Sequence, residues 1–160
     1  MPVVDNSCWS DGRKDILVRV DDDTCPPPMP PLEQMTLWLS WYDPAKCYDE
    51  NGNVIKNINC DENPREMAAG MAVEGAYGQV CACIPQWDIE DVVHVEGIGS
   101  WTCQDRGGDV RPTYRRIYHP KFGFVYMWIL PIDVLADYEN PPAWEFEPIA
   151  PEDWYLVPHE

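Results

Sequence analysis

Three observations predict a mostly β domain with extended arms. Proline contributes 17 of the 160 residues, and because proline ends helices and is tolerated in sheets only at their edges, a helical bundle is disfavoured. Short apolar segments also alternate with more polar residues, as Leu37, Leu39 and Trp41 do, and this is the spacing of a strand. Glycines and turn signals such as Asn51-Gly52 separate these segments and favour hairpin connections.

The chain is predicted to have three parts. Residues 1–34 form an N-terminal arm with one expected strand at 16–20 and a polyproline-like connector at 26–31. Residues 35–138 form the domain, and residues 139–160 form an extended acidic arm rich in proline and aromatic residues. Arms of this kind are held either by their own domain or by neighbouring subunits, and both alternatives are open at this point.

Further segments of the domain have the apolar character of strands. They are residues 35–42, 80–84, 92–95, 100–103, 122–130 and 132–135. Short helical turns are expected around 64–67 and after Asp88. Residues 112–132 are expected to form an inserted hairpin with a basic tip, since Tyr-Arg-Arg-Ile-Tyr-His-Pro-Lys at 114–121 is the one concentration of positive charge in the chain.

The formal net charge of −17 at pH 7 argues against two classes of partner. A field of this sign repels nucleic-acid phosphates and anionic membrane surfaces, so no nucleic-acid partner is expected. No segment approaches the ~20 apolar residues of a membrane-spanning helix, so no membrane span is expected either. The acidic charge serves solubility, or it attracts a basic partner or divalent cations, and the sequence leaves these alternatives open.

The seven cysteines indicate disulfides and therefore an oxidising compartment. Because their number is odd, at least one thiol is free or pairs between chains. No zinc site and no cofactor are expected, since Cys81-x-Cys83 is the one close pair and no second pair or spaced histidines accompany it. The sequence does not determine the connectivity. The candidate pairs are Cys8–Cys25, Cys47–Cys60 and Cys83–Cys103.

The first residues, Met-Pro-Val-Val-Asp-Asn-Ser-Cys, show no positively charged region followed by an apolar run, so no secretory signal is visible. A cysteine-rich chain without such a signal fits a virion protein, which is made in the cytosol and released by lysis into oxidising surroundings. A trimmed or unconventional export route fits as well. We therefore expect a virion or extracellular location.

Several short motifs follow one another in the middle of the chain. They are Met-Ala-Ala-Gly at 67–70, Gly-Gln-Val-Cys-Ala-Cys-Ile-Pro at 78–85, Val-Glu-Gly-Ile-Gly at 95–99, Asp-Arg-Gly-Gly at 105–108 and Ile-Asp-Val at 132–134. In this order they resemble the three-aspartate (3D) domain, a double-psi β-barrel similar to the catalytic domain of membrane-bound lytic transglycosylase A and to expansin-like barrels. The most specific part of the resemblance is Asp-x-Gly-Gly followed by Ile-Asp-Val.

The resemblance implies a six-stranded double-psi-like β-barrel with an inserted β-hairpin and extended arms. Asp105 matches the second family aspartate and Asp133 the third, which is the catalytic one in the transglycosylases. Alternation along the strand would turn Asp133 to the face opposite Ile132 and Val134, so that both carboxylates share one groove. Paired carboxylates are what glycoside cleavage needs.

The implied reaction is cleavage of a β-1,4 glycosidic bond in peptidoglycan. Asp133 would protonate the leaving oxygen and then act as the base on the sugar's own 6-hydroxyl, and Asp105 would stabilise positive charge or raise the pKa of Asp133. Arg111 stands where the family has a lysine and would hold a carboxylate or the glycan. Trp101 would offer a stacking surface to a sugar ring.

The sequence also departs from the family pattern. Cys83, or Ile84 in the neighbouring register, stands where the first aspartate belongs, and the hairpin at 112–132 is an insertion. The alternative roles are a turn carboxylate for Asp105 and a hydrogen-bonded rim residue for Asp133.

Two functions are therefore carried forward. One is a structural or accessory protein of a virion or extracellular assembly, which contacts other subunits through its arms and hairpin and binds cell-wall glycan. The other is a lytic transglycosylase-like enzyme that uses Asp133 and Asp105.

Overall fold

The computed structural model describes residues 15–19, 25–43, 76–107, 109–137 and 140–160. In this part of the chain, strands account for 47% of the residues and no α-helix is present, so the prediction of a mostly β fold is confirmed. The strands are β1 (Leu17–Val18), β2 (Thr36–Tyr42), β3 (Val80–Ala82), β4 (Val92–Val95), β5 (Gly99–Asp105), β6 (Thr113–His119), β7 (Gly123–Leu135), β8 (Glu147–Ile149) and β9 (Trp154–Val157).

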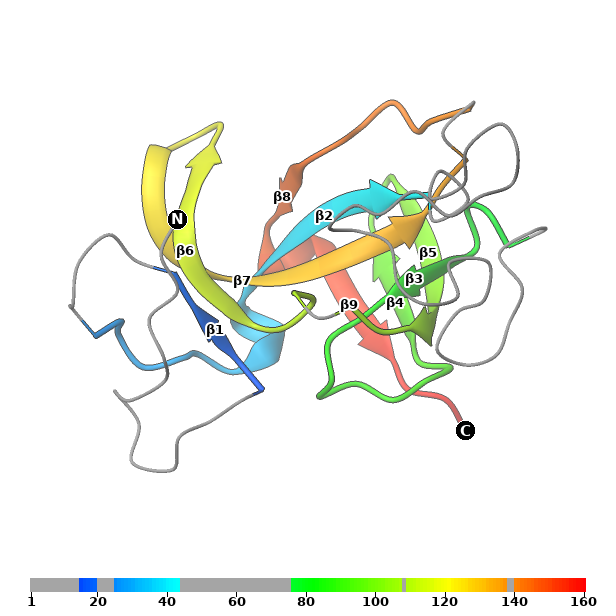
Figure 1. The fold of residues 1–160 in the computed structure, drawn as a ribbon, viewed down its shortest axis with the longest axis horizontal. Helices are drawn as coiled ribbons and strands as arrows, with labels where there is room; N and C mark the ends of the chain where they lie inside the picture. The colour runs from blue at the N-terminus through cyan, green and yellow to red at the C-terminus, as the bar shows by residue number, and fades with distance from the viewer. Residues whose placement is uncertain (1–14, 20–24, 44–75, 108, 138–139) are drawn as a thin grey trace, which may run out of the picture.

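The nine strands form one open, mixed sheet (Figure 1). Its order is β1-β6-β7-β3-β5-β4-β9, and β2 joins the sheet by pairing with both β7 and β8. Two short 3₁₀ turns, Leu32–Gln34 and Pro151–Asp153, precede β2 and β9. None of the helical turns in the described ranges has the length and apolar character needed to cross a membrane.

β7 is one strand of 13 residues, where the sequence predicted a break between 122–130 and 132–135. Both β6 and β2 pair with Ile129, so they lie on opposite edges of β7. Both β2 and β3 pair with Asp133 and Val134, so β3 lies on the same edge as β6. Pro131 falls in the gap between β6 and β3, where one edge of β7 has no partner among the described strands. A missing N–H is tolerated at such a position, and the strand continues through the proline.

A hairpin is present where the sequence predicted one, and it is built from β6 and the first half of β7. Its register runs from Thr113 beside Ile129 to His119 beside Gly123. Gly123 closes the turn with φ of 74°, a left-handed conformation that favours glycine. Figure 1 shows this hairpin rising from one end of the molecule.

The C-terminal residues pack on their own domain. β8 pairs antiparallel with β2, and β9 pairs antiparallel with β4. Trp154 is 6% exposed, and its indole Nε1 donates a hydrogen bond of 3.0 Å to the carbonyl of Met35. These two strands were not foreseen in the segment that the sequence predicted as an extended arm.

The main core lies on one face of the sheet and collects the alternate residues of the long strands. Its fully buried members include Leu37, Leu39, Leu130, Ile132, Val93 and Ile84. A smaller cluster of Ala76, Val80 and Leu135 lies apart from it, with Tyr42 packed against both. The residues between the core positions of β2 and β7 are thereby directed to the other face.

The disulfide predicted between Cys83 and Cys103 is confirmed, and it joins the end of β3 to β5. Cys25 is disulfide-bonded as well. Cys81 is a free and buried thiol. The predicted pairs Cys8–Cys25 and Cys47–Cys60, the turn at 51–52 and the helical turn at 64–67 involve residues outside the described ranges.

Replacing both Cys83 and Cys103 by alanine should lower the free energy of unfolding by about 3 kcal/mol. The bridge closes a loop with a sequence separation of 20, and this loop constrains the unfolded chain. Urea unfolding of the variant and the wild type measures the difference, with Cys81→Ala as the control for loss of a buried sulfur. An unfolding midpoint equal to that of the control would contradict a constraining role for this bridge.

Candidate functional site

The two predicted aspartates lie in one row that crosses four adjacent strands. The register of β2 on β7 sets Ser40 beside Asp133. The register of β3 sets Ala82 beside Asp133 on one side and beside Asp105 of β5 on the other. Two inter-strand spacings therefore separate the Cα atoms of the aspartates, about 10 Å. Ala82, the residue between them on β3, is small and 3% exposed.

Strand alternation turns Asp133 away from the main core, as the sequence predicted. Its neighbours Ile132 and Val134 are both buried in the core cluster, whereas Asp133 is half-buried on the opposite face. Asp105 reaches the same face by a different route. The β3–β5 register pairs Cys81 with Cys103 and then Ala82 with Asp105, so Gln104 is one extra residue on β5.

This irregularity decides where the second carboxylate points. In a regular strand Asp105 would share the core face with Cys103, which is fully buried. The extra residue at Gln104 reverses the alternation, which is a known use of a β-bulge beside a functional site. The backbone N–H of Cys83 then donates to the carbonyl of Asp105 at 3.2 Å and resumes the pairing.

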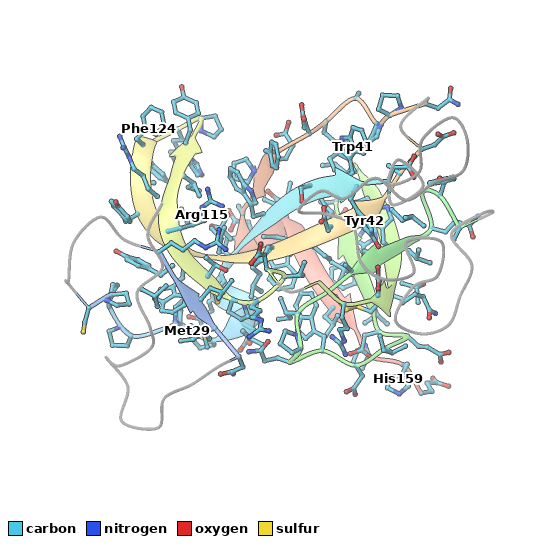
Figure 2. The ribbon with its side chains drawn as sticks, viewed as in Figure 1. Met29, Trp41, Tyr42, Arg115, Phe124 and His159 are labelled. Atoms are coloured by element: carbon cyan, nitrogen blue, oxygen red, sulfur yellow. A yellow bond between two sulfur atoms is a disulfide. The ribbon has the colours of Figure 1, made fainter. Side chains whose placement is uncertain are left out.

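Both carboxylates are held by side chains of β2, two residues apart on the same face. The Ser40 hydroxyl donates to Asp133 Oδ1 at 2.8 Å. The Tyr42 hydroxyl donates to Asp105 Oδ2 at 2.5 Å, and the backbone N–H of Arg106 donates to Asp105 Oδ1 at 2.9 Å. Figure 2 labels Tyr42 at the end of β2. Neither Ser40 nor Tyr42 was expected from the sequence.

The surroundings of the site raise the pKa of three acidic groups, those of Asp133, Tyr42 and Cys81. Burial raises the pKa of Asp133, and the nearby charge of Asp105 raises it further, against the opposing effect of the Ser40 hydrogen bond. Burial and then Asp105 raise the pKa of Tyr42, so its hydroxyl keeps its proton. Burial and both carboxylates raise the pKa of the Cys81 thiol as well, so this thiol is not a nucleophile at neutral pH.

The loop after β5 is fixed by Arg106 and by a close contact at Gly107. The Arg106 guanidinium donates to the carbonyls of Ile84 and of Trp87, the latter at 2.6 Å, and so ties this loop to the segment after β3. A Cβ atom on Gly107 would lie 2.8 Å from Cγ2 of Val110. Any larger residue at Gly107 would therefore displace the Val110 side chain, and this steric limit favours the first glycine of the Asp-x-Gly-Gly motif.

One of the two predicted substrate-binding residues, Trp101, does not lie at the row of aspartates. Trp101 is 5% exposed and belongs to the main core, where its ring lies 6.0 Å from that of Trp144. Its faces are therefore not presented at the row of aspartates. Arg111 stands just before β6, where its carbonyl accepts a hydrogen bond of 2.6 Å from the Thr113 hydroxyl.

A second group of polar side chains lies where the C-terminus meets the β4 region. Ligand-capable atoms of Asp88, Asp91 and His159 lie within 4.8 Å of one another. Asp91 is 4% exposed, and its carboxylate already accepts from the backbone and lies 2.8 Å from the ring Nδ1 of His159. Burial alone would raise the pKa of Asp91, but the hydrogen bonds from His159 and Asp88 together lower it. These contacts hold His159, which Figure 2 labels, against the segment that precedes β4.

Comparison with known proteins gives no further evidence on identity. No family model, curated protein or solved structure matches the chain. The case for a function therefore depends on the geometry of the site and on the motifs of the sequence.

Replacing Asp133 by asparagine should stabilise the folded protein at neutral pH, by roughly 1 kcal/mol. The pKa of Asp133 in the folded state lies above its ordinary value of 3.8, so the ionised form is disfavoured by folding. That cost is absent below the ordinary pKa and appears as the pH rises through the folded-state pKa. Asparagine keeps an oxygen for Ser40 and carries no charge.

Urea unfolding at pH 7 and below about pH 4 tests this expectation, because Asp and Asn differ little once the carboxyl is protonated. The matched control is Asp153→Asn, which removes an exposed carboxylate. A variant that is no more stable than the wild type at pH 7, or a gain that is equal at both pH values, would contradict the raised pKa.

Proposed function

We propose that this chain is a 3D-type domain that binds peptidoglycan and cleaves it as a lytic transglycosylase. One observation carries the proposal: Asp105 and Asp133 lie in one row on one face, and burial raises the pKa of Asp133. A carboxyl group with a raised pKa close to a second carboxyl group is the arrangement that glycoside-cleaving sites use.

In the proposed reaction Asp133 gives a proton to the glycosidic oxygen, and the bond from the anomeric carbon to that oxygen breaks. The developing positive charge on the sugar faces the Asp105 carboxylate. The sugar's 6-hydroxyl oxygen then bonds to the anomeric carbon, and its proton passes to Asp133, which is restored. No water is consumed, and the product is a 1,6-anhydro sugar. Ser40 and Tyr42 are positioning residues, because each orients a carboxylate and neither is asked to transfer a proton.

The finer fold is proposed with the function. The Asp-x-Gly-Gly motif ends β5 and the Ile-Asp-Val motif lies on β7, with β3 between them. Parallel pairs (β2–β7 and β3–β5) and an antiparallel pair (β3–β7) meet at this point. This meeting of the two motifs supports a six-stranded double-psi-like barrel as the parent architecture of the open sheet.

A second candidate is a non-catalytic, glycan-binding or structural domain in a virion or extracellular assembly. The observation that favours it is the Cys83–Cys103 bridge, which occupies the place of the first family aspartate. The disulfides at Cys83–Cys103 and at Cys25 also support an oxidising location for either function.

The deciding experiment is digestion of purified peptidoglycan, with mass spectrometry of the soluble products. The wild type should release anhydro-muropeptides, and Asp133→Asn should release none while binding the same sacculi. Asp153→Asn is the control and should be as active as the wild type. If the wild type is folded and binds sacculi without releasing products, the enzymatic proposal is wrong and the non-catalytic candidate is favoured.

Tyr42→Phe should reduce turnover about 10- to 100-fold with little change in sacculus binding. The change removes the hydrogen bond to the charged Asp105, and bonds of this kind contribute roughly 1.5–3 kcal/mol. Initial rates of anhydro-product release measure the effect, and Tyr155→Phe on the exposed side of β9 is the matched control. Equal rates for the two variants would show that the Tyr42 hydroxyl does not position Asp105 for catalysis.

A further inference from the structure

One face of the β6–β7 hairpin is a continuous ladder of aromatic rings with one cation. The cross-strand pairs are Tyr114 with Trp128, Arg116 with Tyr126, and Tyr118 with Phe124. Ring centroids lie 5.6 Å apart in the first pair and 5.2 Å apart in the last. The Arg116 guanidinium lies 4.6 Å from the centroid of the Phe124 ring.

The ladder is buried at its inner end and open at its tip. Trp128 is 6% exposed, Tyr126 37%, Tyr118 59% and Phe124 66%. Phe122, at 61%, lies beside them with Lys121 above its ring. Figure 2 shows Phe124 at the free end of the hairpin. Four of the eight exposed large apolar side chains in the described ranges belong to this hairpin.

The hairpin is also the positive part of an acidic chain. Residues 112–132 contain three of the 11 Lys and Arg residues and none of the 28 Asp and Glu residues. This stretch therefore carries +3 in a chain of −17, which leaves −20 for the remainder. A partner for the tip is expected to be acidic as well as apolar.

At its inner end the ladder already binds an extended, proline-rich segment of its own chain. Pro27, Pro28 and Pro30 of the chain's own connector line a groove of about 400 Å³ together with Tyr114, Tyr126 and Trp128. The Trp128 indole donates a hydrogen bond of 2.9 Å to the carbonyl of Pro27. Aromatic grooves with an indole donor are the usual receptors for extended proline-rich segments. The open outer half continues this established contact.

We infer that the outer half of the ladder binds residues 140–148 of a second copy of this chain. This segment, Asn-Pro-Pro-Ala-Trp-Glu-Phe-Glu-Pro, is extended, rich in proline and acidic. Glu145 and Phe146 are both exposed, Phe146 at 61%, so a charge and a ring are available for Arg116 and Phe124.

The contact forms between copies because one copy cannot make it alone. β8 holds residues 147–149 against β2, and Phe146 stacks on Trp38 with centroids 6.2 Å apart. Figure 1 shows the 140–146 segment running from the right of the view to β8 near the centre, whereas the hairpin tip stands at the left. Two hairpins do not pair with each other, because both are positive. The interface is therefore head-to-tail, and it leaves each end of a dimer open to further copies.

The test is sedimentation velocity of the full chain over a wide range of concentration. The wild type should form dimers and longer species that weaken as salt rises. A hairpin variant (Arg116→Glu with Phe124→Ser) and a segment variant (Glu145→Lys with Phe146→Ser) should each raise the self-association Kd about tenfold or more. Tyr155→Ser, an exposed ring elsewhere, is the control and should associate as the wild type does.

Mixing the two variants gives the sharpest outcome. The intact segment of the hairpin variant fits the intact hairpin of the segment variant, so the mixture should form a one-to-one dimer and nothing longer. Unfolding midpoints equal to that of the wild type establish that both variants are folded. A monomeric wild type, or assembly that survives in the hairpin variant, overturns the inference. If the hairpin variant loses assembly but the segment variant does not, the ladder binds another part of the second copy, and the role proposed for residues 140–148 is wrong.

Discussion

The pairing of β7 is the constraint on which the rest of the structure depends. The first half of this 13-residue strand pairs with β6 along one edge. The second half pairs with β2 along one edge and with β3 along the other. One end of the strand is therefore a two-stranded hairpin, and the other lies within the sheet. This division places Asp133 beside Ser40 of β2 and two strands away from Asp105 of β5. It also leaves the outer part of the aromatic ladder, beyond Tyr114, without a further strand among the described residues.

The site combines two carboxyl groups whose burial costs stability with two hydroxyl groups that hydrogen-bond to them. A half-buried carboxylate with a raised pKa costs stability at neutral pH, and a second carboxylate nearby adds to the cost. Hydroxyl donors at Ser40 and Tyr42 offset part of it, because each satisfies one carboxylate oxygen. Functional sites commonly retain such destabilising groups, since a tuned pKa is required for proton transfer.

The sequence predicted the parts of the fold that local patterns determine. Alternation located β2, β4 and β5, and the motif order singled out Asp105 and Asp133. The sequence could not predict the parallel pairing of β2 with β7, which brings Ser40 and Tyr42 to the aspartates across more than sixty residues of chain. Nor could it predict the extra residue at Gln104, because a bulge is defined by its partner strand. Trp101 shows the same limit, since a tryptophan in an alternating strand gives no sign of which face is the core.

In the proposed assignment to the three-aspartate family the first aspartate is absent, and this bears on what chemistry two carboxylates can perform. Cys83 and Ile84, the two positions that could correspond to it, are both 0% exposed and lie in the main core. An acid at Ile84 would be buried among apolar side chains and would cost several kcal/mol, and an acid at Cys83 would remove the bridge to Cys103. Hydrolysis by inversion needs a second carboxylate to activate water, whereas attack by the sugar's own hydroxyl lets one group give and then recover the proton. With Asp133 as that group and Asp105 left to stabilise charge, the proposed transglycosylase reaction needs no third acid.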